Sequence, residues 1–265
     1  MEMKFEHQSF SKRLKSMLVV DFRRMFTMPF LYIMMGCCLV MPILILVMTT
    51  MMDGTVTVNP QTGVETVVKG FDNTWQAIGS VSGAAMSMDL TSMCNINMLY
   101  FFIAVLVCIF VGADFRSGYV KNLFTVRSKK TDYIASKTVV CFIGGAFMLL
   151  AFFVGTLLGG AIAGLPFEMN GFHIGGLIMC MLTKLILVAV FVPIYLLMAT
   201  IAKEKTWLSI ILSMMTGMFL FMMIPMLTPL NATLIHVILC LAGGVLFSVG
   251  FGAISNLILK KNDIV

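Results

Sequence analysis

PFLYIMMGCCLVMPILILVMTTMM, the stretch at residues 29–52, has no charged side chain along its whole length. A helix rises about 1.5 Å per residue, so about 20 apolar residues cross the roughly 30 Å hydrocarbon core of a bilayer. This stretch is long enough, and five comparable runs follow it, at residues 96–113, 137–163, 174–200, 207–225 and 233–259. The runs predict an all-α integral membrane protein with six transmembrane helices.

The composition of the whole chain also indicates a membrane protein. Hydrophobic residues make up 60% of the 265 residues and charged residues 11%, whereas soluble domains are about 45–50% apolar. The net charge of +6 does not indicate nucleic-acid binding, because the Lys and Arg residues stand mainly at the ends of the apolar runs. We therefore expect membrane lipid, and no nucleic acid, as a partner.

No catalytic or metal-binding pattern is visible in the sequence. No glycine-rich loop ends in Gly-Lys-Ser/Thr, and no His-Glu-x-x-His sequence occurs. The seven cysteines lie in or beside apolar runs, without the spacing of metal ligands. We expect a chain that is not itself an enzyme and that carries neither a metal nor a cofactor.

The positive residues predict the orientation of the chain. All Lys and Arg residues except Lys69 and Lys184 lie in the N-terminal segment, in the loop after the second run, or just after the fourth and sixth runs. Segments rich in Lys and Arg are retained in the cytoplasm. Both termini are therefore predicted to be cytoplasmic, with an N-terminal segment at 1–28, a membrane domain at 29–259 and a tail at 260–265.

Residues 9–28 are predicted to form an amphipathic helix in the cytoplasmic interface of the membrane. One face carries Phe10, Leu14, Met17, Leu18, Phe22, Met25 and Phe26, and the other favours Lys12, Arg13, Arg23 and Arg24. An ordinary cytoplasmic extension is the alternative. Pro29 suits the first position of the membrane helix that follows.

The loop at 53–95, between the first two runs, is predicted to be extracellular and to hold a small insertion. Two β-prone segments, 55–58 and 64–68, flank an Asn-Pro-Gln-Thr-Gly sequence and predict a β-hairpin. Residues 75–90 are weakly apolar and rich in Gly, Ser, Ala and Met. We expect them to form an external helix rather than a seventh span.

Small residues recur at helical spacing in two of the runs. They are Gly155, Gly159, Gly160 and Gly164 in the third run, and Gly243, Gly244, Ser248 and Gly252 in the sixth. Such residues let helix backbones approach each other. Close helix packing is expected at both places.

The cytoplasmic loop at 114–136 carries the clearest functional signal. It begins with DFRSGYVKNL, residues 114–123, in which charged residues are mixed with aromatic and aliphatic ones. The glycine permits a tight bend. The loop therefore predicts a short amphipathic element that is better suited to docking a protein than to binding lipid alone.

The size of the chain and the order of its elements resemble the permease subunit of type-2 ABC transporters. The sharpest point of resemblance is residues 114–123, which are similar to the family's acidic-x-x-Ser-Gly element followed by a basic residue. The resemblance is particularly to the group that exports, or confers immunity to, lantibiotics, bacitracin-like antibiotics and amphipathic peptide toxins of the phenol-soluble-modulin kind. In that family this loop is a coupling helix that fits a groove on the ATP-binding subunit. By resemblance, the coupling residues are Asp114, Phe115, Arg116, Ser117, Gly118, Tyr119 and Lys121.

The same resemblance implies the partners of the chain. It implies two copies of an ABC ATP-binding subunit, which bind the ATP and Mg, and a second copy of this chain or a related permease. The implied cargo is an amphipathic peptide, and the implied location is a bacterial plasma membrane.

Two features inside or between the membrane runs are candidates for the transport path. Lys184 lies within the fourth run, where a charge costs roughly 2.5–3.5 kcal/mol. It either lines a translocation cavity, where it attracts an acidic group of a substrate or Asp89 of the first external loop, or snorkels to the interface. Pro225 and Pro229 lie in the apolar stretch that joins the last two runs. This stretch forms either an outer gate, as in the external hairpin of type-2 permeases, or an ordinary short loop.

Two other functional classes are open to test. A stand-alone secondary transporter or channel predicts paired acids within the membrane and often an inverted repeat, but only Lys184 is charged there and no convincing repeat is found. An intramembrane enzyme predicts a nucleophile with a base, or a metal cluster, and no such set is found.

Overall fold

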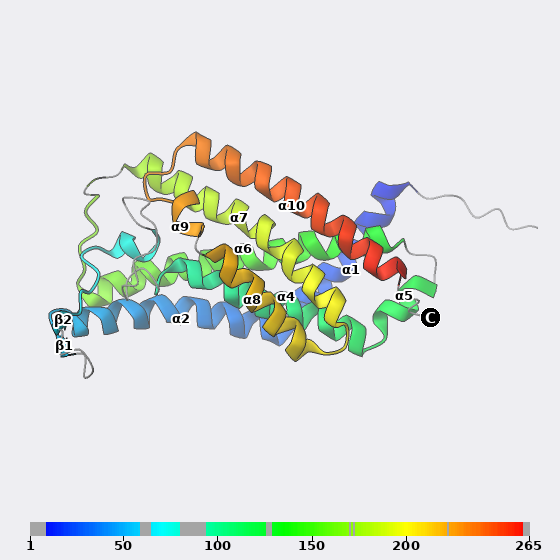
Figure 1. Cartoon of the computed structure of the whole chain (residues 1–265), viewed down its shortest axis with the longest axis horizontal. Coiled ribbons are helices and arrows are strands. Elements are labelled where there is room, and N and C mark those ends of the chain that lie inside the picture. Colours follow the sequence, from blue (N-terminus) through cyan, green and yellow to red (C-terminus); the bar gives the residue numbers. More distant parts are fainter. Residues whose placement is uncertain are drawn as a thin grey trace, which may run out of the picture.

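The computed structural model describes residues 9–58, 65–79, 94–125, 129–169, 171, 173–221 and 223–261. These residues form mainly helices (Figure 1). Within these described residues, five helices are long and apolar enough to cross a membrane. They are α2 (Pro29–Met52), α4 (Leu99–Arg116) with the preceding 3-10 helix η2 (Ile96–Met98), α6 (Lys130–Ala163), α7 (Ile174–Ala202) and α10 (Leu234–Lys261). The predicted class, a helical membrane protein, is confirmed.

The run predicted at 207–225 is divided into two helices. Helix α8 (Thr206–Phe221) is apolar but has 16 residues, a length of about 24 Å at the usual rise per residue. A separate short helix, α9 (Ile224–Leu227), follows it with Pro225 in its first turn. Proline has no backbone N–H and clashes with the preceding turn, so it favours a break at this point. Six complete spans stay a prediction.

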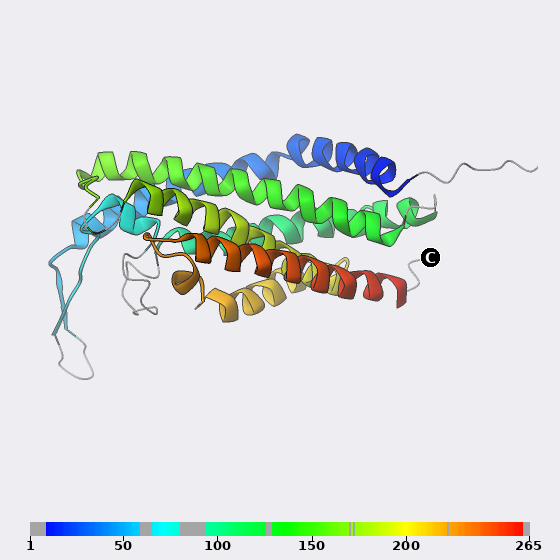
Figure 2. The same cartoon turned by 90° about the horizontal axis from the view of Figure 1, so that it is seen from above.

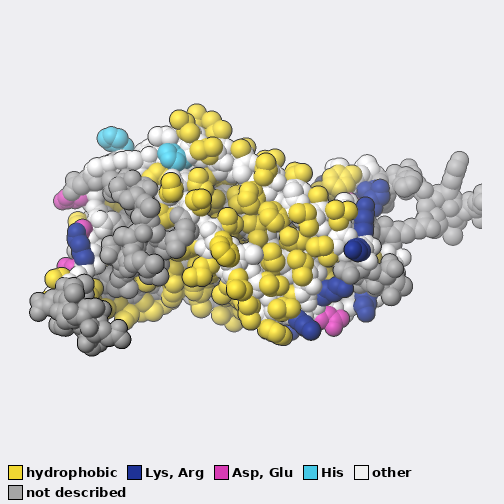
Figure 3. All heavy atoms as spheres, viewed as in Figure 1, with side chains coloured by type: hydrophobic (Ala, Val, Ile, Leu, Met, Phe, Trp, Pro, Cys, Tyr) yellow, Lys and Arg dark blue, Asp and Glu magenta, His cyan; other side chains and the backbone are white. Residues whose placement is uncertain are grey.

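The long helices run side by side along one axis (Figure 1 and Figure 2). Helix α2 packs against α6, α10 packs against α7, and α4 lies among α6, α7 and α8. Apolar side chains cover the middle of the bundle, and Lys and Arg gather at one end (Figure 3). We call this the basic end. It also holds the C-terminus of α10, and we call the opposite end, which carries strands β1 and β2, the hairpin end.

Helix α1 (Phe10–Thr27) packs against α6 near the basic end (Figure 2). Asp21 is buried on its inner face. Arg13 and Arg24 point to the same side, where each pairs with an acidic residue of another helix. The predicted basic face is therefore wrong for Arg13 and Arg24, because both arginines form ion pairs with acidic residues of other helices.

The close packing of α2 on α6 depends on two glycines. A Cβ atom at Gly155 would clash with the carbonyl oxygen of Leu39, and one at Gly159 would lie 2.8 Å from the Cα atom of Ile43. The small-residue prediction is confirmed at both positions.

Helix α10 approaches α7 in a similar way. A Cβ atom at Gly244 would lie 3.4 Å from the Cβ atom of Ala189, and the Ser248 hydroxyl donates to the Ala189 carbonyl oxygen at 3.2 Å. The prediction for the last run is therefore confirmed at these two small residues.

The insertion between α2 and α4 contains the predicted hairpin. Strands β1 (Val56–Val58) and β2 (Glu65–Val67) pair in antiparallel fashion. The 3-10 helix η1 (Thr74–Ala77) follows, and Trp75 donates from Nε1 to the carbonyl oxygen of Phe167 at 3.0 Å. Most of the external helix predicted at 75–90 lies outside the described residues.

Candidate functional site

The predicted coupling loop bends at the basic end of the bundle. Helix α4 ends at Arg116, and α5 (Tyr119–Thr125) begins three residues later (Figure 1). Gly118 lies between them with a φ of 70°, a left-handed conformation that glycine adopts without strain. The glycine predicted to permit a bend therefore occupies one.

The seven predicted coupling residues divide into buried and exposed sets. Asp114 and Phe115 are buried, Arg116, Ser117 and Lys121 are exposed, and Gly118 and Tyr119 are partly buried. In this conformation Arg116, Ser117 and Lys121 are accessible to another protein, whereas Asp114 and Phe115 are enclosed by the bundle.

Asp114 belongs to a cluster of four charged side chains from three helices, of which three are buried and Arg24 is partly exposed. The Nζ atom of Lys137, in α6, lies 2.7 Å from Asp114 Oδ2 and 2.8 Å from Asp21 Oδ1. The guanidinium of Arg24, in α1, pairs with Asp114 Oδ1 and lies 3.9 Å from Asp21 Oδ1. Two carboxylates thus face two cations. We call these four residues the ion cluster.

Neutral groups complete the surroundings of the two carboxylates. The Tyr133 hydroxyl donates to Asp114 Oδ2 at 3.1 Å, and the Ser136 hydroxyl donates to Asp21 Oδ2 at 2.6 Å. The ring of Phe110 lies beneath the Lys137 ammonium, with 4.1 Å between Nζ and the ring centroid. Every oxygen of the two carboxylates therefore has a donor, which buried charges require if they are to be stable.

Arg24 also connects the ion cluster to α5. Its guanidinium carbon lies 4.1 Å from the centroid of the Tyr119 ring. Burial by itself would lower the pKa of Arg24, but Asp114, Tyr119 and Asp21 together outweigh it, and the pKa is raised. Burial raises the pKa of the Tyr119 phenol, so the ring is neutral where it meets the cation. The loop is thereby joined to α1 by a cation–π contact.

A second ion pair also joins α1 to α6. Arg13 Nε lies 2.8 Å from Asp132 Oδ2, and Asp132 is buried. Asp21 and Asp132 do not stand out in the sequence, and Lys137 is there only one of many cytoplasmic positive charges. One signal was available, because Asp21 is the only acidic residue in α1. A single carboxylate within a basic, apolar helix predicts an internal partner.

A second buried cation lies in α7, away from the ion cluster. Lys184 has no exposed surface, and its Nζ atom donates to Asn97 Oδ1 at 2.9 Å and to Thr228 Oγ1 at 2.8 Å. The Tyr100 hydroxyl donates to the backbone carbonyl of Lys184 at 2.9 Å. In this structure Lys184 therefore neither lines an open cavity nor extends to the surface.

The predicted gate prolines lie next to this lysine in the fold. Pro225 and Pro229 are buried and flank Thr228, the acceptor for Lys184. The Thr228 carbonyl also accepts a hydrogen bond from Cys180 Sγ at 3.5 Å. Two features predicted separately, the membrane lysine and the proline segment, are thus brought into contact.

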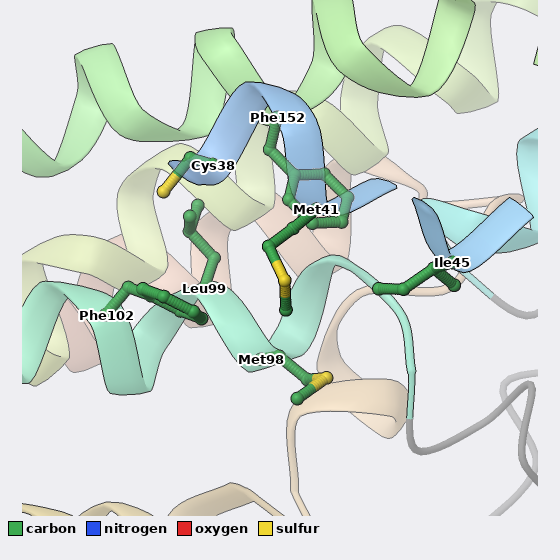
Figure 4. Close-up of a pocket in the computed structure, with 7 residues that line it drawn as sticks. All are labelled: Cys38, Met41, Ile45, Met98, Leu99, Phe102 and Phe152. Carbon is green, nitrogen blue, oxygen red and sulfur yellow. The ribbon is translucent and has the colours of Figure 1, made fainter. Parts of the chain in front are cut away.

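A small, closely packed apolar pocket lies between α2, α4 and α6, and it leaves no space for a water molecule (Figure 4). It is lined by Cys38, Met41, Ile45, Met98, Leu99, Phe102 and Phe152. Met98 directly follows Asn97, which accepts the hydrogen bond from Lys184.

The described residues contain no group of three or more His, Cys, Asp or Glu side chains that could hold a metal ion.

A family model described as "ABC-2 family transporter protein" matches residues 22–220, more than half of the chain. The chain belongs to the ABC-2 transporter family. No curated protein and no solved structure matches it.

Membership of the ABC-2 transporter family defines the general role of the chain. ABC-2 permeases are multi-pass membrane subunits that are typically not catalytic themselves, and they work with an ABC ATP-binding partner. The region matched in this ABC-2 transporter includes the α4–α5 loop, Lys137 and Lys184. It ends before α9 and α10, so Thr228 lies outside it.

Proposed function

We propose that this chain forms the translocation path of an ATP-driven exporter for amphipathic peptides, such as antimicrobial peptides or peptide toxins of the lantibiotic, bacitracin or phenol-soluble-modulin kind. It works as two copies, or with a related permease, together with two ATP-binding subunits that bind ATP and Mg. The membrane is a bacterial plasma membrane, and both chain termini are cytoplasmic. The alternative is a secondary transporter or channel without an ATPase partner.

The observation that carries this proposal is the ion cluster beneath the α4–α5 loop. An ATP-binding subunit that drives transport must convert its own movement into a movement of membrane helices. The ion cluster joins the end of α4 to α1 and α6, and Arg24 connects it to α5. A displacement of the loop is therefore transmitted to three helices at once.

The loop residues take different roles in this proposal. Arg116, Ser117 and Lys121 are exposed and form the docking surface. Asp114 and Phe115 are buried and position that surface. Exposed cations favour a partner whose groove carries acidic side chains.

The proposed orientation follows from the position of the charges. Lys and Arg gather at the basic end of the bundle, where α5 lies (Figure 3). Positive residues favour the cytoplasmic side. This orientation presents the docking surface to the compartment that contains ATP.

The proposed cargo rests on the resemblance to peptide exporters and on the apolar character of the helices. The chain contains 26 Met and 22 Phe residues. Flexible methionine side chains adapt to irregular apolar ligands. An amphipathic peptide fits a surface of this kind.

A double charge reversal tests the docking surface. We expect Arg116→Glu with Lys121→Glu to reduce co-purification of the ATP-binding subunit by at least roughly tenfold, because both cations face the partner. Peptide-stimulated ATP hydrolysis should fall with it. The measurements are quantitative mass spectrometry of the complex, purified from its membrane in mild detergent, and ATPase assays on the same samples.

The matched control is Lys12→Glu with Lys205→Glu, which changes the charge equally at two exposed positions outside the loop. It should leave the complex intact. Equal recovery of the ATP-binding subunit with both double variants would contradict the docking assignment. A wild-type chain that purifies without any ATP-binding subunit would favour the secondary transporter or channel.

A further inference from the structure

Residues 71–79 of the insertion, drawn in cyan, lie at the hairpin end of the bundle, where η1 packs against α2 and α6 (Figure 2). The Thr74 amide donates to the carbonyl oxygen of Pro166 at 3.2 Å. The Trp75 indole donates to that of Phe167 at 3.0 Å. Both acceptors belong to the connection between α6 and α7, so this connection holds the segment in place.

The apolar side chains of this segment are buried, although the segment lies outside the membrane helices. They are Phe71, Trp75, Ala77 and Ile78. Trp75 and Ile78 share an apolar cluster with Leu177 of α7 and with Leu230, which follows α9. The segment therefore continues the core of the bundle at its hairpin end.

A glycine of α6 makes room for this segment. A Cβ atom at Gly160 would overlap the Thr74 side chain. The sequence predicts Gly160 as a small residue of helix packing, whereas the structure places the insertion against it. The absence of a side chain at this position lets the segment reach α6.

The same segment contacts the predicted outer gate, which lies at residues 224–231. A Cβ atom at Gly79 would lie 3.3 Å from the carbonyl oxygen of Thr228, within the outer gate. That atom would also lie 3.6 Å from Cys180 Sγ, in α7. Residues 71–79 therefore pack on both the outer gate and α7.

The two ends of the bundle are held by different kinds of contact. At the basic end, ion pairs join α1 to α4 and α6. At the hairpin end, residues 71–79 are held by hydrogen bonds to carbonyl groups and by apolar contacts. Separation of a buried ion pair leaves an uncompensated charge, whereas water can satisfy a carbonyl group that loses its donor. The hairpin end is therefore the end that opens more readily.

We propose that residues 71–79 form a lid over the hairpin end, and that this lid opens together with the outer gate during transport. The inference rests on the proposed function, whose orientation places the hairpin end outside the cell. An exporter must open this end to release its cargo. Because Gly79 lies against Thr228, a displacement of the outer gate displaces the lid.

A disulfide tests the lid, because the chain already has a cysteine beside it. Gly79→Cys places a thiol next to Cys180, and dithiodipyridine as oxidant then joins the two sulfurs and holds the lid closed. Disulfide formation in the purified complex is measured as the loss of two thiols that react with maleimide-PEG after denaturation in SDS. Gly79→Ser, and Gly79→Cys combined with Cys180→Ser, are the matched controls, since neither can form this bond.

We expect the disulfide to form in the nucleotide-free complex. In the complex trapped with ATP and vanadate it should form at least roughly tenfold more slowly, because opening lowers the population in which the two sulfurs meet. ATP hydrolysis by the oxidised variant should fall, and it should return when dithiothreitol reduces the bond. Equal rates in the two states, no disulfide in either state, or full ATP hydrolysis by the oxidised variant would overturn the lid.

Hydrogen exchange separates this inference from the proposed function. If no ATP-binding subunit accompanies the chain, the proposed function is wrong, and hydrogen exchange of the purified chain, measured by mass spectrometry, tests the lid alone. We expect residues 71–79 to exchange as one unit while α6 and α7 stay protected, as for a local opening. Exchange of the segment only together with α6 and α7 would overturn the lid.

Two glycine variants sharpen this measurement. Gly160→Ala pushes against Thr74 and should speed the exchange of residues 71–79 by roughly tenfold relative to wild type. Gly175→Ala is the control, because a Cβ atom at Gly175 would have no described atom of another part of the chain within 4 Å. Equal exchange rates in the two variants would show that Thr74 is not held against Gly160, and the proposal would fall.

Discussion

Lys137 and Lys184 are both fully buried in helices of the bundle, but their partners differ in charge. Lys137 lies between the carboxylates of Asp21 and Asp114, at 2.8 and 2.7 Å. Lys184 lies between an amide oxygen and a hydroxyl, at 2.9 and 2.8 Å. The two polar contacts of each lysine have nearly the same lengths, and the charge of the acceptors differs. Lys137 also lies over the Phe110 ring.

This difference separates two kinds of buried cation. The charge of Lys137 is neutralised within the ion cluster. The charge of Lys184 is hydrogen-bonded to neutral groups and is not neutralised by a described residue. Burial alone therefore does not predict the role of a lysine inside a membrane protein; the charge of its partners does.

Removal of Lys137 should have the largest effect on stability. Lys137→Met leaves two buried carboxylates with Arg24 as the remaining cation of the cluster, and breaking a buried ion pair costs about 3–5 kcal/mol. We expect a correspondingly large fall in the free energy of unfolding, measured by thermal or SDS titration in detergent. Lys69→Met, which removes an exposed pair, should change it by about 0–1 kcal/mol. Similar losses for both variants would contradict the structural role of Lys137.

Removal of one charge of each sign should have a smaller effect. Asp21→Asn combined with Lys137→Met leaves Arg24 and Asp114 as a neutral pair. Because no uncompensated charge stays buried, we expect the double variant to lose only about 1–2 kcal/mol, as for lost hydrogen bonds. The same unfolding titration measures it. A double variant that is less stable than Lys137→Met would show that charge balance is not what the ion cluster provides.

Removal of Lys184 should have the smallest effect. Lys184→Met deprives Asn97 and Thr228 of a donor, but it also removes a buried charge whose cost offsets that loss. We expect a change in the free energy of unfolding within about 1 kcal/mol. A loss as large as that of Lys137→Met would mean that the two lysines have the same structural role and would remove the contrast between them.

The positions of the membrane helices were largely predictable from the sequence, because hydropathy is a property of consecutive residues. Pro29 begins α2 and Met52 ends it, as predicted. Helix α6 begins at Lys130 rather than at residue 137, because its first turns carry polar residues that pack against α1 instead of facing lipid. The break between α8 and α9 was less visible, since its residues are as apolar as those of a continuous span.

The candidate sites were predictable only in part. The α4–α5 loop stood out because its charged and aromatic residues are contiguous, and Lys184 stood out as a charge within an apolar run. The division of the loop into buried Asp114 and exposed Arg116 was not predictable, because it depends on which side of α4 faces α1 and α6.

The sequence by itself determined that this chain is a helical membrane protein without the phosphate-binding loop of an ATPase, and it indicated the type-2 ABC permeases. Runs of apolar residues, segments of positive charge and short motifs are all local, so folding is not needed to read them. Only the tertiary structure decided which charges are paired. Residues 21, 114 and 137 lie far apart in the chain, as do residues 97, 184 and 228, and helix packing alone brings each set within hydrogen-bonding distance.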